Sequence, residues 1–192
     1  RLAAGRDLRN PIKIRVFRSK IPNAFTAPGG YIGVFEGLFR HARTPEDFAG
    51  VLAHEMGHAQ LRHPEKLLLR QAGLALLFAA LTGDPSALAA SGGEFAKKML
   101  HLSFTREAEL ESDREAVKML NHAGMGSGGL ARFLERLQKN APELAEGGYF
   151  STHPAAGERI AAIKKTTRPG RPPMSEKEWN AIRRMCANTG SW

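Results

Sequence analysis

The sequence contains very little cysteine and no long run of apolar residues. Its 192 residues include a single cysteine, Cys186, which excludes an internal disulfide and any zinc site built from cysteines. The longest apolar run covers residues 72–81, about half of the ~20 residues that a membrane-spanning helix needs. Hydrophobic residues make up 42% and charged residues 24%, which excludes a wholly disordered chain. We therefore expect one globular domain with short appendages at most.

Acidic residues are scarce at the two ends of the chain. The net charge is +9, and residues 1–20 and 159–192 each carry a net charge of +6. Basic ends are usually solvated flanks, but they also attract anionic membranes and nucleic acid. The basic ends contain no recognised nucleic-acid-binding motif and no regular alternation of aromatic and basic residues. We therefore expect no nucleic-acid partner and leave membrane proximity open. Because the chain begins with Arg1 rather than Met, we expect any signal peptide or anchor to lie outside it.

Helix signals outnumber strand signals along the chain. Two segments have the pattern of short strands that would pair into a small antiparallel sheet, 12–17 and 31–35, with a loop over 22–30 between them. Helices are predicted from a Thr44 cap to about residue 62, then over 65–81, 94–122, 130–140 and 155–165. A Pro-rich linker and a last short helix opened by a capping box at Ser175 follow. The sequence therefore predicts an α+β fold that is mostly α.

One short motif carries recognisable chemistry. Residues 54–58 read His-Glu-Met-Gly-His, and on a helix His54 and His58 lie on the same face, one turn apart. Two imidazoles in that arrangement can occupy adjacent positions around a tetrahedral Zn²⁺. Glu55 points about 100° away from His54, where it can reach a metal-bound water without binding the metal. This spacing is typical of zinc peptidases.

A catalytic zinc needs a third protein ligand, and it must come from further along the chain. Pro64 and Leu61 occupy the positions where a short-range His ligand and its glycine would stand. Within the helix predicted over 94–122, Glu109 and Asp113 share a face that is otherwise apolar, whereas Glu107 and Glu111 lie on the opposite, solvent-facing side. We expect Glu109 to bind the metal.

Asp113 is expected not to bind the metal itself but to accept a hydrogen bond from the imidazole of a metal-binding histidine. The alternative for the Glu109 and Asp113 pair is a salt bridge to Arg106 or to another buried arginine, because buried carboxylates need cations or hydrogen bonds. Among the other histidines, His63 and His122 lie at predicted helix ends and are interpreted as structural. His153 lies in a turn before a helix, where a functional role is possible.

These segments together resemble metallopeptidase family M48, the family of HtpX, BepA and the type I CAAX prenyl proteases. The resemblance covers about residues 10–165. It rests on Asn23-Ala24-Phe25 with Pro28-Gly29-Gly30, on the zinc motif, on Arg106-x-x-Glu109-x-x-Ser112-Asp113, and on Thr152-His153-Pro154 with Arg159. Ser112 stands where the family usually has alanine. The resemblance implies a zincin-like fold of the gluzincin type, and it places His153 near the zinc.

The resemblance also suggests how the chain is organised. Residues 1–165 would form the catalytic domain, and residues 166–192 a basic linker with a short helix. The family's membrane helices and its tetratricopeptide domain have no counterpart in this stretch, so the chain resembles a minimal soluble catalytic domain. Prenylated substrates are therefore not implied, and we expect a role in protein quality control in the bacterial cell envelope, with any anchor outside the chain.

The predicted activity is hydrolysis of peptide bonds in protein substrates by one Zn²⁺ per chain. His54, His58 and Glu109 would hold the metal, and Glu55 would be the general base. The strand formed by Tyr31, Ile32, Gly33 and Val34 would bind an extended substrate by strand addition. His153 would either occupy the open metal position and block it, or stabilise the oxyanion. The alternative function is a non-catalytic zinc-containing domain that binds unfolded or membrane-associated protein.

Overall fold

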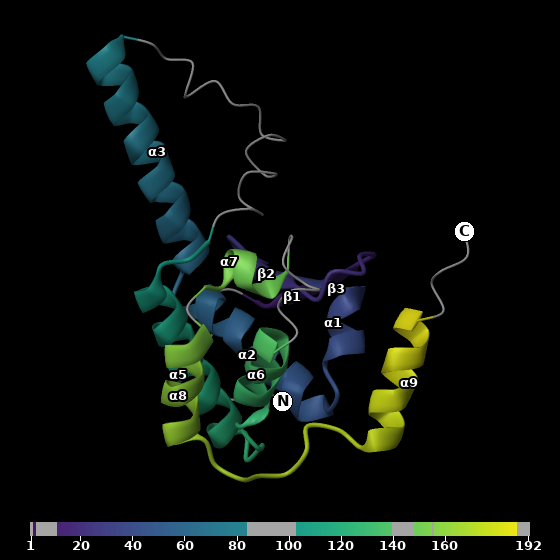
Figure 1. Ribbon diagram of the computed structural model, residues 1–192. Helices are drawn as coiled ribbons and strands as arrows, with labels where there is room; N and C mark the ends of the chain where they lie inside the picture. The colour runs from purple at the N-terminus through teal and green to yellow at the C-terminus, as the bar shows by residue number, and fades with distance from the viewer. Residues whose placement is uncertain (1, 3–10, 84–102, 140–147, 155, 188–192) are drawn as a thin grey trace.

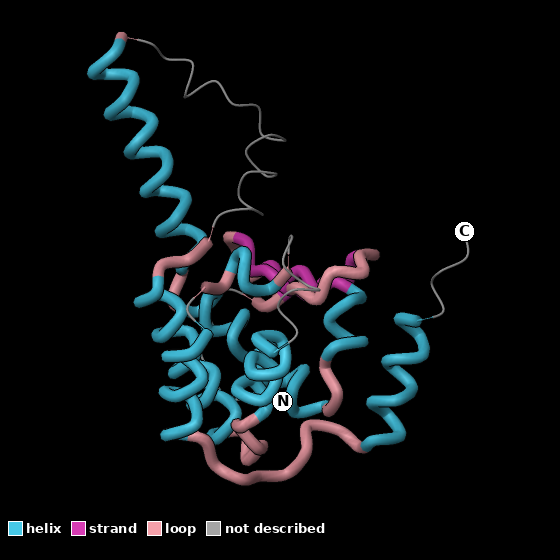
Figure 2. Tube along the Cα trace, viewed as in Figure 1, coloured by secondary structure: helices cyan, strands magenta, loops and turns pink. Residues whose placement is uncertain are grey.

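The computed structural model describes residue 2 and residues 11–83, 103–139, 148–154 and 156–187. Helices form a body beneath one small sheet, as Figure 1 shows, and Figure 2 separates the few strands from the many helices. The mostly helical fold with a small sheet confirms the predicted class. Among the described residues, no helix has both the length and the hydropathy needed to cross a membrane.

The sheet has three strands in the order β1-β3-β2. Strand β2 (Ala24–Ala27) and strand β3 (Tyr31–Phe35) form an antiparallel hairpin, while β1 (Lys13–Phe17) pairs with β3 in parallel. The hairpin turn contains Gly29 and Gly30, whose φ angles of 83° and 81° favour glycine.

Three predictions about the sheet are wrong. The segments 12–17 and 31–35 pair in parallel rather than antiparallel, because the chain reverses twice between them through the unpredicted strand β2. The predicted loop over 22–30 therefore contains a strand. The alternation in β1 predicts a half-buried strand, but all five of its residues are exposed, since β1 is an outer strand of the sheet.

Helix α2 (Pro45–Gln60) runs through the centre of the body. Thr44 and Asp47 form a reciprocal capping box at its start, and Pro45 occupies the first turn. The buried Asp47 carboxylate also pairs with Arg136. The helix packs against α5 (Arg106–His122), α6 (Gly129–Lys139) and β2.

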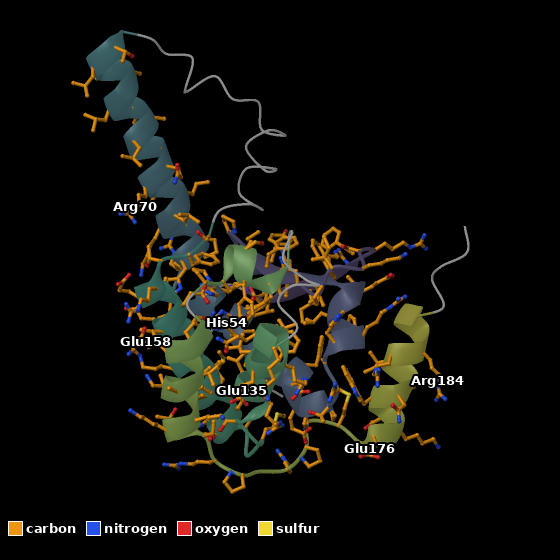
Figure 3. The ribbon with its side chains drawn as sticks, in the orientation of Figure 1. His54, Arg70, Glu135, Glu158, Glu176 and Arg184 are labelled. Atoms are coloured by element: carbon orange, nitrogen blue, oxygen red, sulfur yellow. The ribbon has the colours of Figure 1, made fainter. Side chains whose placement is uncertain are left out.

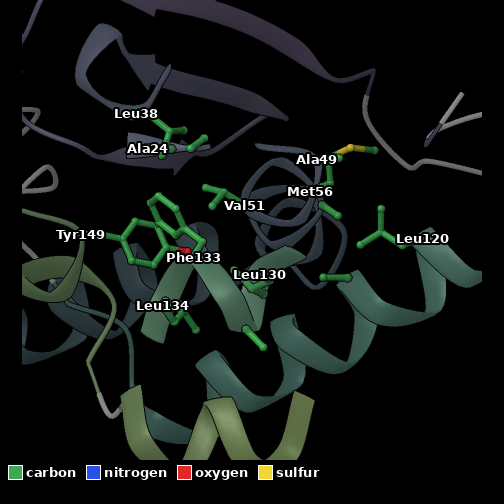
Figure 4. Close-up of a cluster of buried hydrophobic side chains, with 14 of the residues drawn as sticks. Ala24, Leu38, Ala49, Val51, Met56, Leu120, Leu130, Phe133, Leu134 and Tyr149 are labelled. Carbon is green, nitrogen blue, oxygen red and sulfur yellow. The ribbon is translucent and has the colours of Figure 1, made fainter. Parts of the chain in front are cut away.

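Glycines set how closely α2 approaches its neighbours. A Cβ at Gly57 would lie 2.7 Å from the Ser112 hydroxyl, and a Cβ at Gly50 would lie 2.5 Å from the Leu130 backbone nitrogen. Below the sheet, side chains from α2, α5, α6 and β2, together with Leu38 and Tyr149, form the apolar core drawn in Figure 4. The helix that carries the His-Glu-Met-Gly-His motif is therefore held on several sides by packed side chains.

The remaining helices of the described residues are α1 (Glu36–His41), α3 (His63–Thr82), α7 (Tyr149–Thr152), α8 (Ala156–Thr166) and α9 (Glu176–Ala187). Three of them lie close to where the sequence predicts them, whereas the two short ones, over residues 36–41 and 149–152, are not predicted. Helix α5 begins at Arg106, with Thr105 as its cap. The predicted helix over 94–122 is therefore wrong for residues 103–105, which are not helical. The part of that prediction over 94–102 lies outside the described residues. Trp179 of α9 is buried beside Phe39 and Phe48. The division into residues 1–165 and 166–192 stays a prediction.

Candidate metal centre

Four buried side chains from three separate segments meet beneath β2. His54 and His58 come from α2, Glu109 from the first turn of α5, and His153 from the residue after α7. Each offers one nitrogen or oxygen atom, and these four atoms all lie within 4.8 Å of one another. All four residues are completely buried, and Figure 3 shows His54 deep inside the body.

The distances between these atoms fit one tetrahedral metal ion. His54 Nε2 lies 3.0 Å from His58 Nε2, and 3.3 Å from both Glu109 Oε2 and His153 Nδ1. His58 Nε2 and His153 Nδ1 lie 3.2 and 3.0 Å from Glu109 Oε1. A tetrahedral zinc with ligand bonds of about 2.0–2.1 Å would separate its ligand atoms by about 3.3 Å. Facing imidazole nitrogens at this spacing need a shared cation or proton, so the residues present fit a metal.

A carboxylate and an arginine orient His54 from behind. Asp113 Oδ1 lies 2.8 Å from His54 Nδ1, and Arg159 binds both oxygens of Asp113 at 2.7 and 2.9 Å. Burial lowers the pKa of His54, but the carboxylates of Glu109 and Asp113 outweigh this effect and raise that pKa to about 9. Asp113 thus lies where the sequence predicts it, and its contact leaves Nε2 facing the other ligand atoms.

Arg159 is a buried arginine of the kind expected if Glu109 and Asp113 form a salt bridge. Its guanidinium also contacts Glu109, and it donates to the carbonyl of His153 at 3.2 Å. Burial raises the pKa of Glu109, but His153 and His54 overcome this effect and hold it far below its ordinary value. Arg106 is not that partner, because it is exposed and pairs with Glu158. The salt bridge and the histidine cluster therefore coexist.

His58 is held from the side opposite to the cluster. Its Nδ1 lies 2.9 Å from Nδ1 of His63, whose Nε2 lies 3.2 Å from Glu111 Oε2. The Phe104 ring stacks on the His58 ring with centroids 4.0 Å apart. Burial keeps the pKa of His58 well below its ordinary value, which favours the neutral ring that a metal requires.

The interpretation of His63 as a purely structural residue at a helix end missed this contact. His63 is the first residue of α3, so it lies at the helix end where a cation is disfavoured. It is buried, and burial lowers its pKa. The signal available in the sequence was its position five residues after His58. Glu111 is exposed as predicted, but its partner is this buried histidine.

Glu55 lies beside the cluster without joining it. Its Oε2 accepts a hydrogen bond from the Thr26 hydroxyl at 2.7 Å, and its Oε1 lies 3.4 Å from His153 Nε2. No described residue donates a hydrogen bond of good geometry to Oε1. A buried carboxylate oxygen that faces the cluster and accepts no hydrogen bond is what a general base for a bound water requires.

Comparison with known proteins decides the family. The profile of peptidase family M48 matches residues 1–167. The chain belongs to peptidase family M48. Relatives include the metalloprotease LoiP of Escherichia coli K12, 30% identical over 158 residues, which make up 80% of this chain and 62% of that protein. The mitochondrial metalloendopeptidase OMA1 of Schizosaccharomyces pombe is 30% identical over 80% of this chain and 46% of its own length.

A third relative of this M48 chain is the β-barrel assembly-enhancing protease of Escherichia coli K12. It is 26% identical over 182 residues, or 86% of this chain and 36% of that protein. The M48 chain thus spans between about a third and two thirds of the length of these three relatives. Family membership confirms the predicted zincin-like metallopeptidase fold.

The strand assigned to substrate in the M48 chain is in the wrong place for strand addition. Residues Tyr31, Ile32, Gly33 and Val34 belong to β3, which has β1 on one side and β2 on the other. Both of its edges are already hydrogen-bonded, so a further strand cannot pair with it. Strand β2 is an outer strand beside the cluster, and its Ala24 carbonyl lies 3.4 Å from His153 Nε2.

Proposed function

We propose that this chain is a zinc-dependent endopeptidase that carries one Zn²⁺ on His54, His58 and Glu109. The observation that carries the proposal is the tetrahedral spacing of the buried donor atoms next to Glu55 Oε1, which accepts no hydrogen bond from a described residue. Two imidazoles and a carboxylate with no thiolate form a donor set typical of catalytic zinc. Zinc bound there would polarise the scissile carbonyl and acidify a water molecule.

The protein's own residues supply the proton transfers. Glu55 takes the proton from the attacking water through Oε1 and passes it to the leaving amine. The Thr26 hydroxyl binds Oε2 and so leaves Oε1 directed at the reacting atoms. Asp113 and Arg159 keep Nδ1 of His54 paired, so that its Nε2 stays available to the metal.

Of the two roles open to His153, its position favours blocking. Its Nδ1 lies among the other three donor atoms, where a catalytic site would hold water. Its ring stacks on Tyr149 with centroids 4.4 Å apart, and its Nε2 faces Glu55 and the Ala24 carbonyl. We propose that this arrangement is a latent state, from which His153 must withdraw before a substrate can enter.

Withdrawal of His153 would also free the edge of β2. The Ala24 carbonyl could then accept a hydrogen bond from an extended substrate instead of from the His153 ring. We therefore place substrate strand addition at β2. Because Thr26 of the same strand contacts Glu55, a peptide bound there would lie beside the general base.

The proposed biological role is turnover of envelope proteins in bacteria. It is supported by the relatives named metalloprotease LoiP and β-barrel assembly-enhancing protease. A non-catalytic zinc domain that binds unfolded protein is the second candidate, and it is favoured only by the closed, fully buried state of the donor cluster.

Metal content tests the ligand assignment. We expect the purified protein to contain about one zinc per chain, measured by elemental analysis, and to lose cleavage of unfolded casein when a chelator removes the metal. Glu109→Ala and His58→Ala should each lose most of the zinc, because each removes a donor atom. Glu107→Ala is the matched control, since Glu107 is an exposed glutamate two residues from Glu109. Full zinc retention in Glu109→Ala would contradict the assignment.

A further inference from the structure

The outer half of α3 presents a large apolar surface. The side chains of Leu74, Leu76, Leu77 and Leu81 are 55–77% exposed, and Leu69 in the inner half is 69% exposed. Figure 1 shows the helix extending away from the other labelled helices and strands. Residues 71–83 contain no charged side chain at all. Exposed apolar surface of this size on one element marks an interaction site.

The inner half of the same helix is basic on the same side. Arg62, Lys66 and Arg70 are exposed and spaced four residues apart, with Arg62 as the helix cap. At 100° per residue the exposed leucines span an arc of about 160°, and Lys66 and Arg70 fall within it. One face of α3 is therefore basic near the body and apolar towards its tip.

We propose that residues 71–82 of α3 insert into one leaflet of an anionic membrane, with Arg62, Lys66 and Arg70 at the headgroups. The helix rises about 16 Å between Arg70 and Leu81, close to half of the ~30 Å hydrocarbon core. Cations next to an apolar tip match anionic headgroups above acyl chains. A helix lying flat on the surface would need a charged opposite face, which residues 71–83 do not have.

Insertion of α3 would bring the candidate active site close to the membrane. The base of α3 contacts the β2–β3 hairpin, where the Gly29 amide donates to the Glu65 carboxylate at 3.1 Å. Strand β2 of that hairpin contacts Glu55 through Thr26. The membrane contact thus lies in the middle of the chain rather than at the basic ends that the sequence singled out.

Vesicle binding by the whole chain tests this proposal. We expect the protein to sediment with vesicles made of phosphatidylcholine and phosphatidylglycerol at a ratio of about 7:3, and to bind vesicles of phosphatidylcholine alone more weakly. The double variant L74Q/L77Q should have an affinity for these vesicles at least about tenfold lower than that of the wild type, because it removes apolar groups from the acyl region. The control I14Q/V16Q changes two exposed apolar residues of β1, 44% and 52% exposed, and should bind like the wild type.

A dye attached to α3 reports insertion directly. The double variant Leu77→Cys/Cys186→Ser would carry an environment-sensitive dye on its single cysteine. Its emission should shift to the blue with anionic vesicles and be quenched by lipids brominated on the acyl chain, unlike a dye at Val16. Undiminished binding by L74Q/L77Q, or an unshifted dye at position 77, would overturn the proposal. A concentration-dependent dimer that L74Q/L77Q abolishes, without vesicle binding, would instead assign this face to a second copy.

A separate observation concerns His63 and Glu111, and it rests on the proposed zinc site. If His58 Nε2 binds the metal, its Nδ1 carries the proton and donates to His63 Nδ1 at 2.9 Å. His63 must then carry its own proton on Nε2, which donates to Glu111 at 3.2 Å. We infer that His63 is a positioning residue for His58, held in the required tautomer by Glu111, as Asp113 is for His54.

Zinc affinity, measured by competition with a chelator, tests this role. His63→Ala should weaken zinc binding about 10- to 100-fold, because His58 loses its acceptor. His63→Asn should restore most of the affinity, since its amide oxygen can stand in the place of Nδ1. Glu111→Ala should weaken binding more than its exposed neighbour Glu107→Ala does.

The outcomes separate this inference from the proposed function. Equal losses in His63→Ala and His63→Asn, with equal melting temperatures of the metal-free proteins, would overturn the positioning role. So would wild-type affinity in His63→Ala while Glu109→Ala loses zinc. If Glu109→Ala also keeps its zinc, the proposed metal site itself is wrong.

Discussion

Glu55→Gln is expected to lower kcat/KM for peptide cleavage by about 10²- to 10⁴-fold, the usual contribution of a general base. Glutamine has nearly the same shape and can still accept the Thr26 hydroxyl through its amide oxygen. It cannot take a proton, so the fold and the zinc content should stay at the level of the wild type. Cleavage of casein and elemental analysis of the same preparation measure both effects.

The control for Glu55→Gln is Glu107→Gln, which makes the same change at an exposed glutamate. A Glu55→Gln protein that cleaves casein at the wild-type rate would exclude Glu55 as the base. If the wild type cleaves no unfolded protein even with zinc fully bound, the non-catalytic binding domain becomes the better function.

His153→Ala is expected to raise cleavage activity. The His153 ring occupies the fourth position of the donor cluster, so an active state without it would be a minor one. Minor states of two-state proteins are populated at about 0.1–10%, so removing the ring should raise kcat/KM about 10- to 10³-fold. Zinc affinity should fall in the same variant, because one donor atom is lost. Ser151→Ala, two residues away on the exposed side of α7, should change neither quantity.

The opposite result would identify the other role for His153. A group that stabilises the oxyanion contributes about 10²- to 10³-fold to kcat, so its removal would lower activity by that factor and leave zinc affinity unchanged. Unchanged activity and unchanged zinc affinity together would show that the ring is only a packing element against Tyr149.

Local patterns predicted the centre of the protein well. The Thr44 and Asp47 capping signals place α2, and its 3.6-residue period puts His54 and His58 on one face. The same period on α5 separates the buried Glu109 and Asp113 from the exposed Glu107 and Glu111. These predictions hold because helix geometry is a local property, set by residues within a turn or two of each other.

The sequence by itself therefore determined the longer helices, the metal motif and the family resemblance, but not the short helices α1 and α7. Only the tertiary structure decided the parallel pairing of β1 with β3, the central position of β3, and the contacts of His63 and Arg159. It also decided that His153, 99 residues after His54, stands among the donor atoms. Such contacts depend on how distant segments pack around one core, and short-range periodicity carries no information about that packing.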